Sequence, residues 1–128
     1  MTIAKLNTNF KKIIKMKNII VLLLVSFLGF STNAQEKKNK NAQYTFEVNG
    51  NCELCQKRIQ KAALSVSGVK SVTWNIETHH LNLILNENKN SVLEVKKAIA
   101  KAGHDTDEVR ATDEAYKNLH SCCVYERK

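Results

Sequence analysis

Four cysteines stand in two close pairs, and these pairs hold most of the chemistry that the sequence offers. Cys52 and Cys55 are separated by two residues, at the point where an alternating strand pattern changes to a helical one. Thiols at a helix N-terminus lie beside unpaired N–H groups and a partial positive charge, which favour the thiolate. The first pair is therefore predicted to be either a clamp for a soft metal ion or a redox dithiol.

The second pair, Cys122 and Cys123, is adjacent in sequence and follows His120 near the C-terminus. A trans peptide holds neighbouring Cα atoms about 3.8 Å apart, short of the ~4.4–6.8 Å span of an ordinary disulfide. We expect these thiols to face a metal ion, the first pair or another chain. His120, Cys122 and Cys123 are predicted as a second metal site or as part of the first, and a tail disulfide or an unpaired thiol is the alternative.

The first 34 residues are predicted to be a secretory signal peptide. Lysines precede an apolar run that begins at Ile19, and the segment ends in small residues at Ala34. The run is too short for a comfortable membrane span of ~20 residues. We expect cleavage after Ala34 and a periplasmic or secreted mature protein that does not span a membrane. An uncleaved anchor is the alternative, and Met16 is a second candidate start.

Charge and length limit the function of the mature chain. The full sequence has a formal net charge of +8, and removing residues 1–34 takes away five lysines and no acids, which leaves +3. No basic stripe with interleaved aromatic residues remains, and this argues against a nucleic-acid binder. Export to an oxidising compartment permits disulfides. The remaining 94 residues suffice for one small domain with a modest core.

Hydrophobic periodicity predicts the elements that position the cysteines. Apolar residues alternate with polar ones at 44–48, 72–76 and 81–85, which indicates strands with one buried face. Apolar residues recur at helical spacing after Cys52 and after Ser91, the expected N-cap of a second helix that Gly103 ends. We expect a fourth, edge strand around 108–111 and a short helix at 114–119, capped by Thr112 or Asp113.

This order of elements predicts an α+β fold. One apolar face on each strand and helix is buried most economically by a ferredoxin-like βαββαβ plait, an antiparallel sheet with both helices on one face. The predicted organisation is a signal peptide at 1–34, a flexible leader at 35–42, the domain at 43–111, and a C-terminal helix with a cysteine tail at 112–128.

Three landmarks of the sequence resemble the heavy-metal-associated domain family. They are Cys52 and Cys55 at the first strand-to-helix junction, Gly68 before the second strand, and Gly103 at the end of the second helix. The family includes copper chaperones, N-terminal modules of copper-transporting ATPases and the periplasmic mercuric-ion-binding protein. The sequence departs from the family at 49–51, where Asn-Gly-Asn replaces the usual Gly-Met-Thr.

The resemblance implies a metal-binding protein that is not an enzyme. Cys52 and Cys55 would bind Cu(I), which prefers soft thiolates, and would pass it by ligand exchange to a partner such as a membrane efflux transporter or a metal-transporting ATPase. Hg(II) delivered to a transporter is the main alternative, and Zn(II) and Cd(II) stay open. His104 resembles the histidine that some copper chaperones add as a further ligand, with a water-exposed loop residue as its alternative role.

A thiol–disulfide redox protein is the enzymatic alternative. Thioredoxin-type enzymes also place two cysteines with this spacing at a helix N-terminus, where a lowered thiol pKa supports exchange. Those enzymes resemble one another in a cis-proline that faces the dithiol, and this chain contains no proline. Their order of strands and helices also differs from the order predicted here. The sequence therefore favours metal binding.

Overall fold

The computed structural model describes residues 11–21 and 36–128, and it divides the chain into two units, Met1–Glu36 and Lys37–Lys128. In the first unit, residues 11–21 form a solvent-exposed helix. The remainder of the predicted signal peptide, including the expected cleavage site after Ala34, lies outside the described residues. Among the residues that are described, no helix is both long and apolar enough to cross a membrane.

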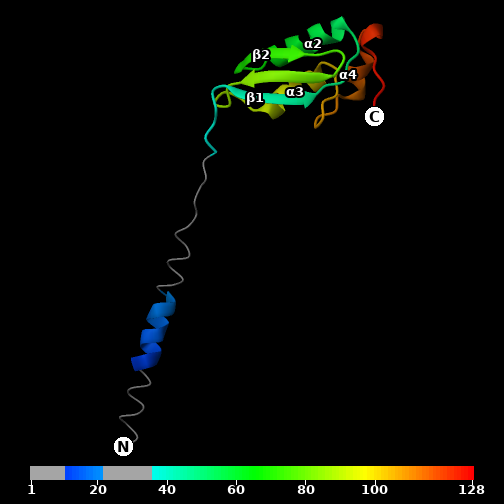
Figure 1. Cartoon of the computed structure of the whole chain (residues 1–128). Coiled ribbons are helices and arrows are strands. Elements are labelled where there is room, and N and C mark those ends of the chain that lie inside the picture. The colour runs from blue at the N-terminus through cyan, green and yellow to red at the C-terminus, as the bar shows by residue number, and fades with distance from the viewer. Residues whose placement is uncertain (1–10, 22–35) are drawn as a thin grey trace, which may run out of the picture. The chain divides into compact units, whose positions relative to one another are not determined.

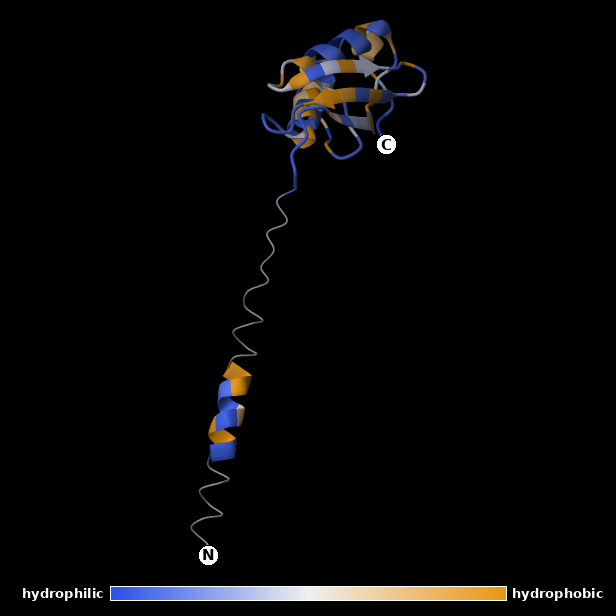
Figure 2. Cartoon of the chain, turned by 60° about the vertical axis from the view of Figure 1, so that its left-hand side comes forward, coloured by the Kyte–Doolittle hydropathy of each residue, from blue (hydrophilic) through white to orange (hydrophobic). Residues whose placement is uncertain are grey.

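The second unit is built on a three-stranded antiparallel sheet (Figure 1). Its strands are β1 (Ala42–Glu47), β2 (Val69–Trp74) and β3 (His80–Leu85), in the order β1-β3-β2. Along β3 the residues Leu81, Leu83 and Leu85 are buried and their neighbours are not. Figure 2 shows hydrophobic and hydrophilic residues together along the strands of this unit. The three strands predicted from periodicity are confirmed.

Two helices, α2 (Glu53–Leu64) and α3 (Val92–Lys101), pack their apolar stripes into the same core as the strands. Ile59 of α2 and Ile99 of α3 are fully buried there, and each such side chain contributes about 1.5–3 kcal/mol relative to an exposed one. Ser91 caps α3, since its Oγ accepts a hydrogen bond from the Glu94 N–H at 3.4 Å. The predicted α+β fold is confirmed.

The strand predicted at 108–111 is wrong in its position and length. Within the described residues, pairing beyond the three strands is limited to a single antiparallel bridge between Val48 and Thr106. Two backbone hydrogen bonds flank it, from Asn49 to Asp105 at 2.9 Å and from Asp107 to Glu47 at 3.2 Å. The chain therefore touches the sheet edge earlier than predicted and for one residue only.

Local bonds and ion pairs keep the segment after this bridge out of the sheet. Thr106 and Val109 close a tight turn on each other, with the Thr106 N–H donating to the Val109 carbonyl at 2.8 Å. Lys96 of α3, whose side chain is buried, holds Asp107 at 2.9 Å and Glu108 at 3.3 Å. The segment thus satisfies its polar groups without a neighbouring strand.

The predicted C-terminal helix is confirmed as α4 (Asp113–Lys117), which ends two residues earlier than expected. Thr112 is its cap, because the Thr112 Oγ1 accepts a hydrogen bond from the Ala115 N–H at 3.1 Å. A single turn of 3-10 helix, η1 (Ser121–Cys123), follows. Cys123 and Tyr125 are buried in the main core, so the C-terminus is an integral part of the domain.

Candidate metal centre

Cys52 and Cys55 stand at the N-terminus of α2, as the sequence predicts. Cys52 is the N-cap residue, and its sulfur accepts a hydrogen bond from the Cys55 N–H at 3.4 Å. The two sulfur atoms lie 3.2 Å apart, and neither is in a disulfide. Cys52 is half-buried and Cys55 is fully buried. One thiol of the pair therefore faces the surface while the other belongs to the core.

The loop that precedes α2 is fitted closely to the core. A Cβ on Gly50 would lie 3.0 Å from the Trp74 ring and 3.1 Å from the Cys55 Cβ, so this position leaves little room for a side chain. The Trp74 Nε1–H donates to the Val48 carbonyl at 3.0 Å. Asn51 completes the loop, because its Oδ1 contacts the Cys55 sulfur at 3.4 Å. The tryptophan is a core residue on which the cysteine loop rests.

The C-terminal turn brings the second cysteine pair to the first. Cys52 Sγ lies 3.5 Å from Cys122 Sγ and 3.7 Å from Cys123 Sγ. The sulfur atoms of Cys52, Cys55 and Cys123 all lie within 4.8 Å of one another. Cys123 is fully buried, whereas Cys122 is exposed. The structure thus joins the two predicted pairs into one group of thiols.

The thiols differ in acidity because one of them receives hydrogen bonds from the others. Burial alone would raise the pKa of Cys52. Hydrogen bonds from the Cys55 amide and from three neighbouring thiols outweigh burial and lower this pKa to about 7. Burial, followed by hydrogen bonds with Cys55 and Cys52, raises the pKa of Cys123. The hydrogen bond with Cys52 raises the pKa of Cys122. Cys52 is therefore more acidic than either tail thiol in the metal-free protein.

A tyrosine fixes the chain just after Cys123. The Tyr125 hydroxyl donates to the Gly103 carbonyl at 3.0 Å and accepts from the Asp105 N–H at 2.8 Å, and both contacts are buried. The Tyr116 hydroxyl donates to the Tyr125 carbonyl. Closer to the cysteines, the Asn51 side-chain amide donates to the Val124 carbonyl at 2.9 Å. These hydrogen bonds therefore fix the C-terminal segment both to the loop before α2 and to the loop after α3.

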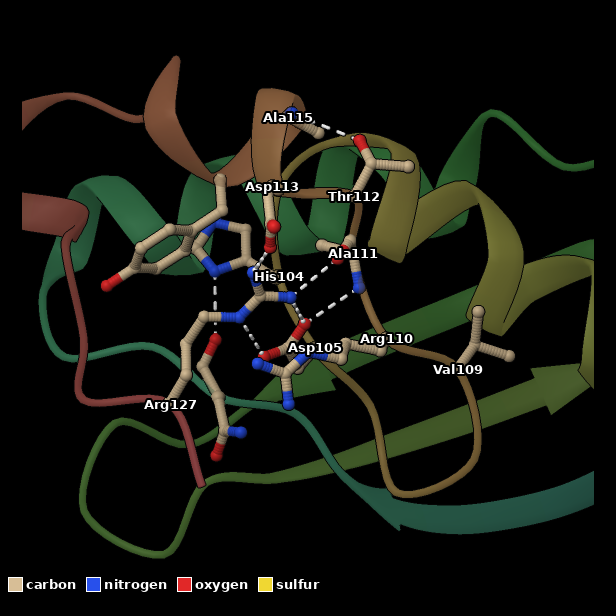
Figure 3. Close-up of polar contacts among 12 residues, drawn as sticks. His104, Asp105, Val109, Arg110, Ala111, Thr112, Asp113, Ala115 and Arg127 are labelled. Carbon is tan, nitrogen blue, oxygen red and sulfur yellow. Dashed lines mark hydrogen bonds and ion pairs between the residues drawn. The ribbon is translucent and has the colours of Figure 1, made fainter.

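Arg127 closes this arrangement with a two-pronged ion pair to Asp105 (Figure 3). Its Nε and Nη2 atoms donate to the two Asp105 carboxylate oxygens at 2.8 and 2.7 Å, and its Nη1 donates to Asp113 at 2.9 Å. The side chains of Arg127 and Asp105 are only 10% and 9% exposed. Burial alone would raise the pKa of Asp105. The hydrogen bonds from Arg127 and from the Ala111 N–H outweigh burial and hold this pKa below its usual value.

His104 is fully buried, so the alternative role of a water-exposed loop residue is wrong. Its Nδ1 lies 2.8 Å from the Asn49 carbonyl, which accepts, so Nδ1 bears the proton and Nε2 is the free acceptor. Its ring stacks on Tyr125, and Nε2 has no hydrogen-bond partner among the described residues. Burial lowers the pKa of His104 and keeps it neutral. The structure does not place its nitrogen atoms in the sulfur group.

The remaining predicted residue, His120, lies at the edge of the group. Its Nδ1 is 3.4 Å from the Cys122 sulfur, and both side chains are exposed. The sequence analysis missed Tyr125 and Arg127, which fix the tail. Hydropathy gave no signal for them, because Cys123, Val124 and Tyr125 are three apolar residues in a row and only the structure shows that Val124 is exposed between two buried neighbours.

Comparison with known families matches the heavy-metal-associated domain to residues 45–105 of this chain. These residues form a heavy-metal-associated domain. The resemblance drawn from the cysteine and glycine landmarks is therefore confirmed. The tail cysteines lie beyond the matched residues, which end at Asp105, so the contact between the two cysteine pairs is a feature that the family match does not describe.

Several solved structures are similar to this domain. MerP from Ralstonia metallidurans CH34, in its oxidized form, is 31% identical over 52% of this chain and 94% of MerP, with a TM-score of 0.50. The CopZ metallochaperone is 27% identical over 51% of this chain and 98% of its own, with a TM-score of 0.49. A copper binding domain from HMA7, a P-type ATPase, is 20% identical over 51% and 89%, also at 0.49. No curated protein sequence matches this chain.

Proposed function

We propose that this protein is exported, binds Cu(I) through Cys52 and Cys55, and transfers the ion to an acceptor protein by ligand exchange. The observation that supports this most strongly is the approach of the two sulfur atoms to 3.2 Å at the start of α2, within a heavy-metal-associated domain. Thiolates are soft ligands that select Cu(I) over hard cations. The helix N-terminus and its N–H groups favour the negative charge that such ligands bear.

Transfer uses the difference in exposure between the two cysteines. Cys55 is buried in the core, whereas Cys52 is half-exposed and can be approached from solvent. A thiolate of the acceptor forms a bond to the ion, the bond from Cys52 breaks, and the bond from Cys55 breaks last. The ion keeps its oxidation state, and each released sulfur leaves as a thiolate. The acceptor is a metal-accepting protein such as a membrane efflux transporter or a metal-transporting ATPase, and no catalysis is involved.

Export adds a condition on this chemistry. The lysines and the short apolar run of residues 1–34 support a cleaved signal peptide. In the oxidising compartment beyond the membrane, thiols this close to each other can form a disulfide. A reduced dithiol is therefore required before Cu(I) binds. N-terminal sequencing of the intact exported protein tests the cut after Ala34.

The test of metal binding is a competition titration under reducing conditions that ranks Cu(I), Hg(II), Zn(II) and Cd(II). Cu(I) should bind most tightly of the four ions. Cys52→Ser should lower the Cu(I) affinity by more than ~100-fold, which exceeds the loss expected for a residue that only hydrogen-bonds a ligand. Serine is itself a preferred N-cap residue, so this variant keeps its fold. Cys122→Ser, with less than threefold loss, is the matched control. Insulin reduction with no tight Cu(I) binding would contradict the proposal and favour the redox alternative.

A mercuric-ion function is the second candidate, and the match to MerP favours it. MerP is the neighbour with 31% identity and a TM-score of 0.50, and a pair of thiolates also suits Hg(II) because that ion is soft. The same titration decides between the two ions when each competes with a small thiol of known affinity. Protection of Cys52 by Hg(II) at a concentration where Cu(I) fails to protect it would establish the mercuric alternative.

A further inference from the structure

The tail of this chain supplies a sulfur atom that a two-cysteine site lacks. Resting on the metal binding proposed above, we propose that Cys123 is a third thiolate ligand of the ion held by Cys52 and Cys55, and that the segment from Cys123 to Arg127 is built to hold it in place. The site is then a three-sulfur site made within one chain, with its third ligand contributed from beyond the heavy-metal-associated domain.

The distances between sulfur atoms favour three ligands over two. With metal–sulfur bonds of about 2.3 Å, a linear two-thiolate site separates its sulfurs by ~4.6 Å, and a trigonal site separates them by ~4.0 Å. Cys52 Sγ lies 3.2 Å from Cys55 Sγ and 3.7 Å from Cys123 Sγ, and the three atoms fall within 4.8 Å of one another. From 3.2 Å, a trigonal site requires the Cys52 and Cys55 sulfurs to separate by ~0.8 Å, whereas a linear one requires ~1.4 Å.

Burial separates the two tail cysteines in role. Cys123 is fully buried within the core cluster that also contains Cys55, while its neighbour Cys122 is exposed. A buried thiolate is costly unless it is paired, and a bond from the Cys123 sulfur to the metal ion, beside the N-terminus of α2, offsets part of that cost. Cys122 approaches Cys52 at 3.5 Å from the solvent side. Cys123 is therefore the ligand, and Cys122 lies outside the site.

The anchor that follows Cys123 gives the third sulfur its fixed position. The Tyr125 hydroxyl bonds to Gly103 and Asp105, and the Arg127 guanidinium binds both oxygens of Asp105. A loose chain end would lose much conformational freedom on joining a metal site. Because the tail is already ordered in the folded protein, its conformational entropy is lost during folding and not on metal binding. The tethered Cys123 thiol therefore acts at a high effective concentration.

X-ray absorption at the copper edge of the Cu(I)-loaded full chain tests the proposal by counting sulfur neighbours. We expect three sulfurs in the wild type and in Cys122→Ser, and two sulfurs with shorter bonds in Cys123→Ser. Cu(I) affinity should fall at least ~10-fold in Cys123→Ser only. Two sulfurs in the wild type, or loss of the third sulfur in Cys122→Ser instead, would overturn it. Failure of the wild type to bind Cu(I) at all would instead refute the proposed function.

The role of Arg127 as a positioning residue has its own test. Arg127→Met should lower Cu(I) affinity by about 10-fold and reduce the sulfur count toward two. In a Cys123→Ser background the same change should have no further effect on affinity, because no third ligand remains to be positioned. Additive losses in the double variant would show that Arg127 acts through general stability, and would overturn the anchoring role while leaving the sulfur count to decide on Cys123.

Discussion

Cys52 and Cys55 are held by regular secondary structure, whereas Cys122 and Cys123 are held by a polar anchor at the end of the chain. The first pair is fixed by the N-cap of α2 and by burial of Cys55. The second pair is fixed by hydrogen bonds and an ion pair that begin two residues later, at Tyr125. Both means bring one fully buried sulfur and one more exposed sulfur to the same place.

This difference suggests a division of work between the regions. A helix terminus built into the core can change only if the domain unfolds. The tail is held by polar contacts and by burial of Cys123 and Tyr125 in the core, and a chain end can open locally at a lower cost than global unfolding. The account therefore assigns two ligands to the first region and a third, more readily released ligand to the second. The predictions below separate the two regions, beginning with the largest expected effect.

Replacing a glycine by alanine should destabilise the two regions to different degrees. Gly103 has a positive φ of 103°, and a Cβ there would lie 2.7 Å from the Leu119 side chain and 2.8 Å from the Ala115 carbonyl oxygen. Gly103→Ala should lower the free energy of unfolding by about 3 kcal/mol, through backbone strain and overpacking. Gly50→Ala, whose Cβ would meet side chains at 3.0 Å and beyond, should cost about 1 kcal/mol. Denaturant unfolding of the metal-free chain measures both, and equal losses would contradict the comparison.

The ion pair of the tail should matter more than an ordinary surface pair. Arg127→Met leaves the nearly buried Asp105 carboxylate without its partner, and we expect a loss of about 2 kcal/mol in the free energy of unfolding, since breaking a buried pair strands a charge. Adding Asp105→Asn removes the unpaired charge. The loss of unfolding free energy in the double variant should therefore be smaller than the sum of the losses in the two single variants. A strictly additive result in this cycle would count against a specific pair.

Stability should fall as the pH decreases, because His104 is buried in its neutral form. Its pKa is lowered in the folded protein, so the unfolded chain binds a proton first, near its ordinary pKa of about 6.5. Below that pH the unfolding free energy should decrease by up to ~1.4 kcal/mol per pH unit, until His104 is protonated in the folded state as well. His104→Gln should flatten this part of the profile. An unchanged slope in that variant would contradict the buried neutral ring.

The smallest expected effect is a difference in thiol reactivity. In the reduced, metal-free protein, the pKa of Cys52 is about 7 and that of Cys122 is raised. Cys52 should therefore react with iodoacetamide at least ~5-fold faster at pH 7, although it is the less exposed of the two, because the thiolate is the nucleophile. Peptide mass spectrometry measures both rates. The advantage of Cys52 should shrink as the pH rises toward 9, and a faster Cys122 at pH 7 would disprove this order of acidity.

Local pattern was enough to predict the first region from the sequence. The strand periodicity of β1 and β3, the Ser91 cap and the placement of Cys55 on the buried face of α2 all depend on neighbours within one or two turns. These signals reflect the periods of a strand and a helix, which backbone geometry sets and the order of apolar and polar residues displays. The fold class followed because few arrangements bury so many single apolar faces.

The second region depends on contacts that sequence spacing does not reveal. Asp105 turns inward to Arg127, 22 residues later, and this inward turn is one reason why no strand forms at 108–111. The sequence left His104 open between a further metal ligand and a water-exposed residue, and the structure instead buries it beneath the Tyr125 ring, which is also far along the chain. Only the packed structure shows that Cys123 approaches Cys52, because ordered chain ends are chosen by tertiary fit and not by local propensity.

The central claim is that Cys123 shares one metal site with Cys52 and Cys55, and that the tail holds no second site. Native mass spectrometry of the full chain, loaded with excess Cu(I) in the presence of a competing chelator, counts the bound ions directly. The account predicts one Cu(I) per wild-type chain, and in Cys52→Ser a weakened site that loses its ion to the chelator, because only two of the three sulfurs of a single site remain. Two ions in the wild type, with one retained by Cys52→Ser, would contradict it.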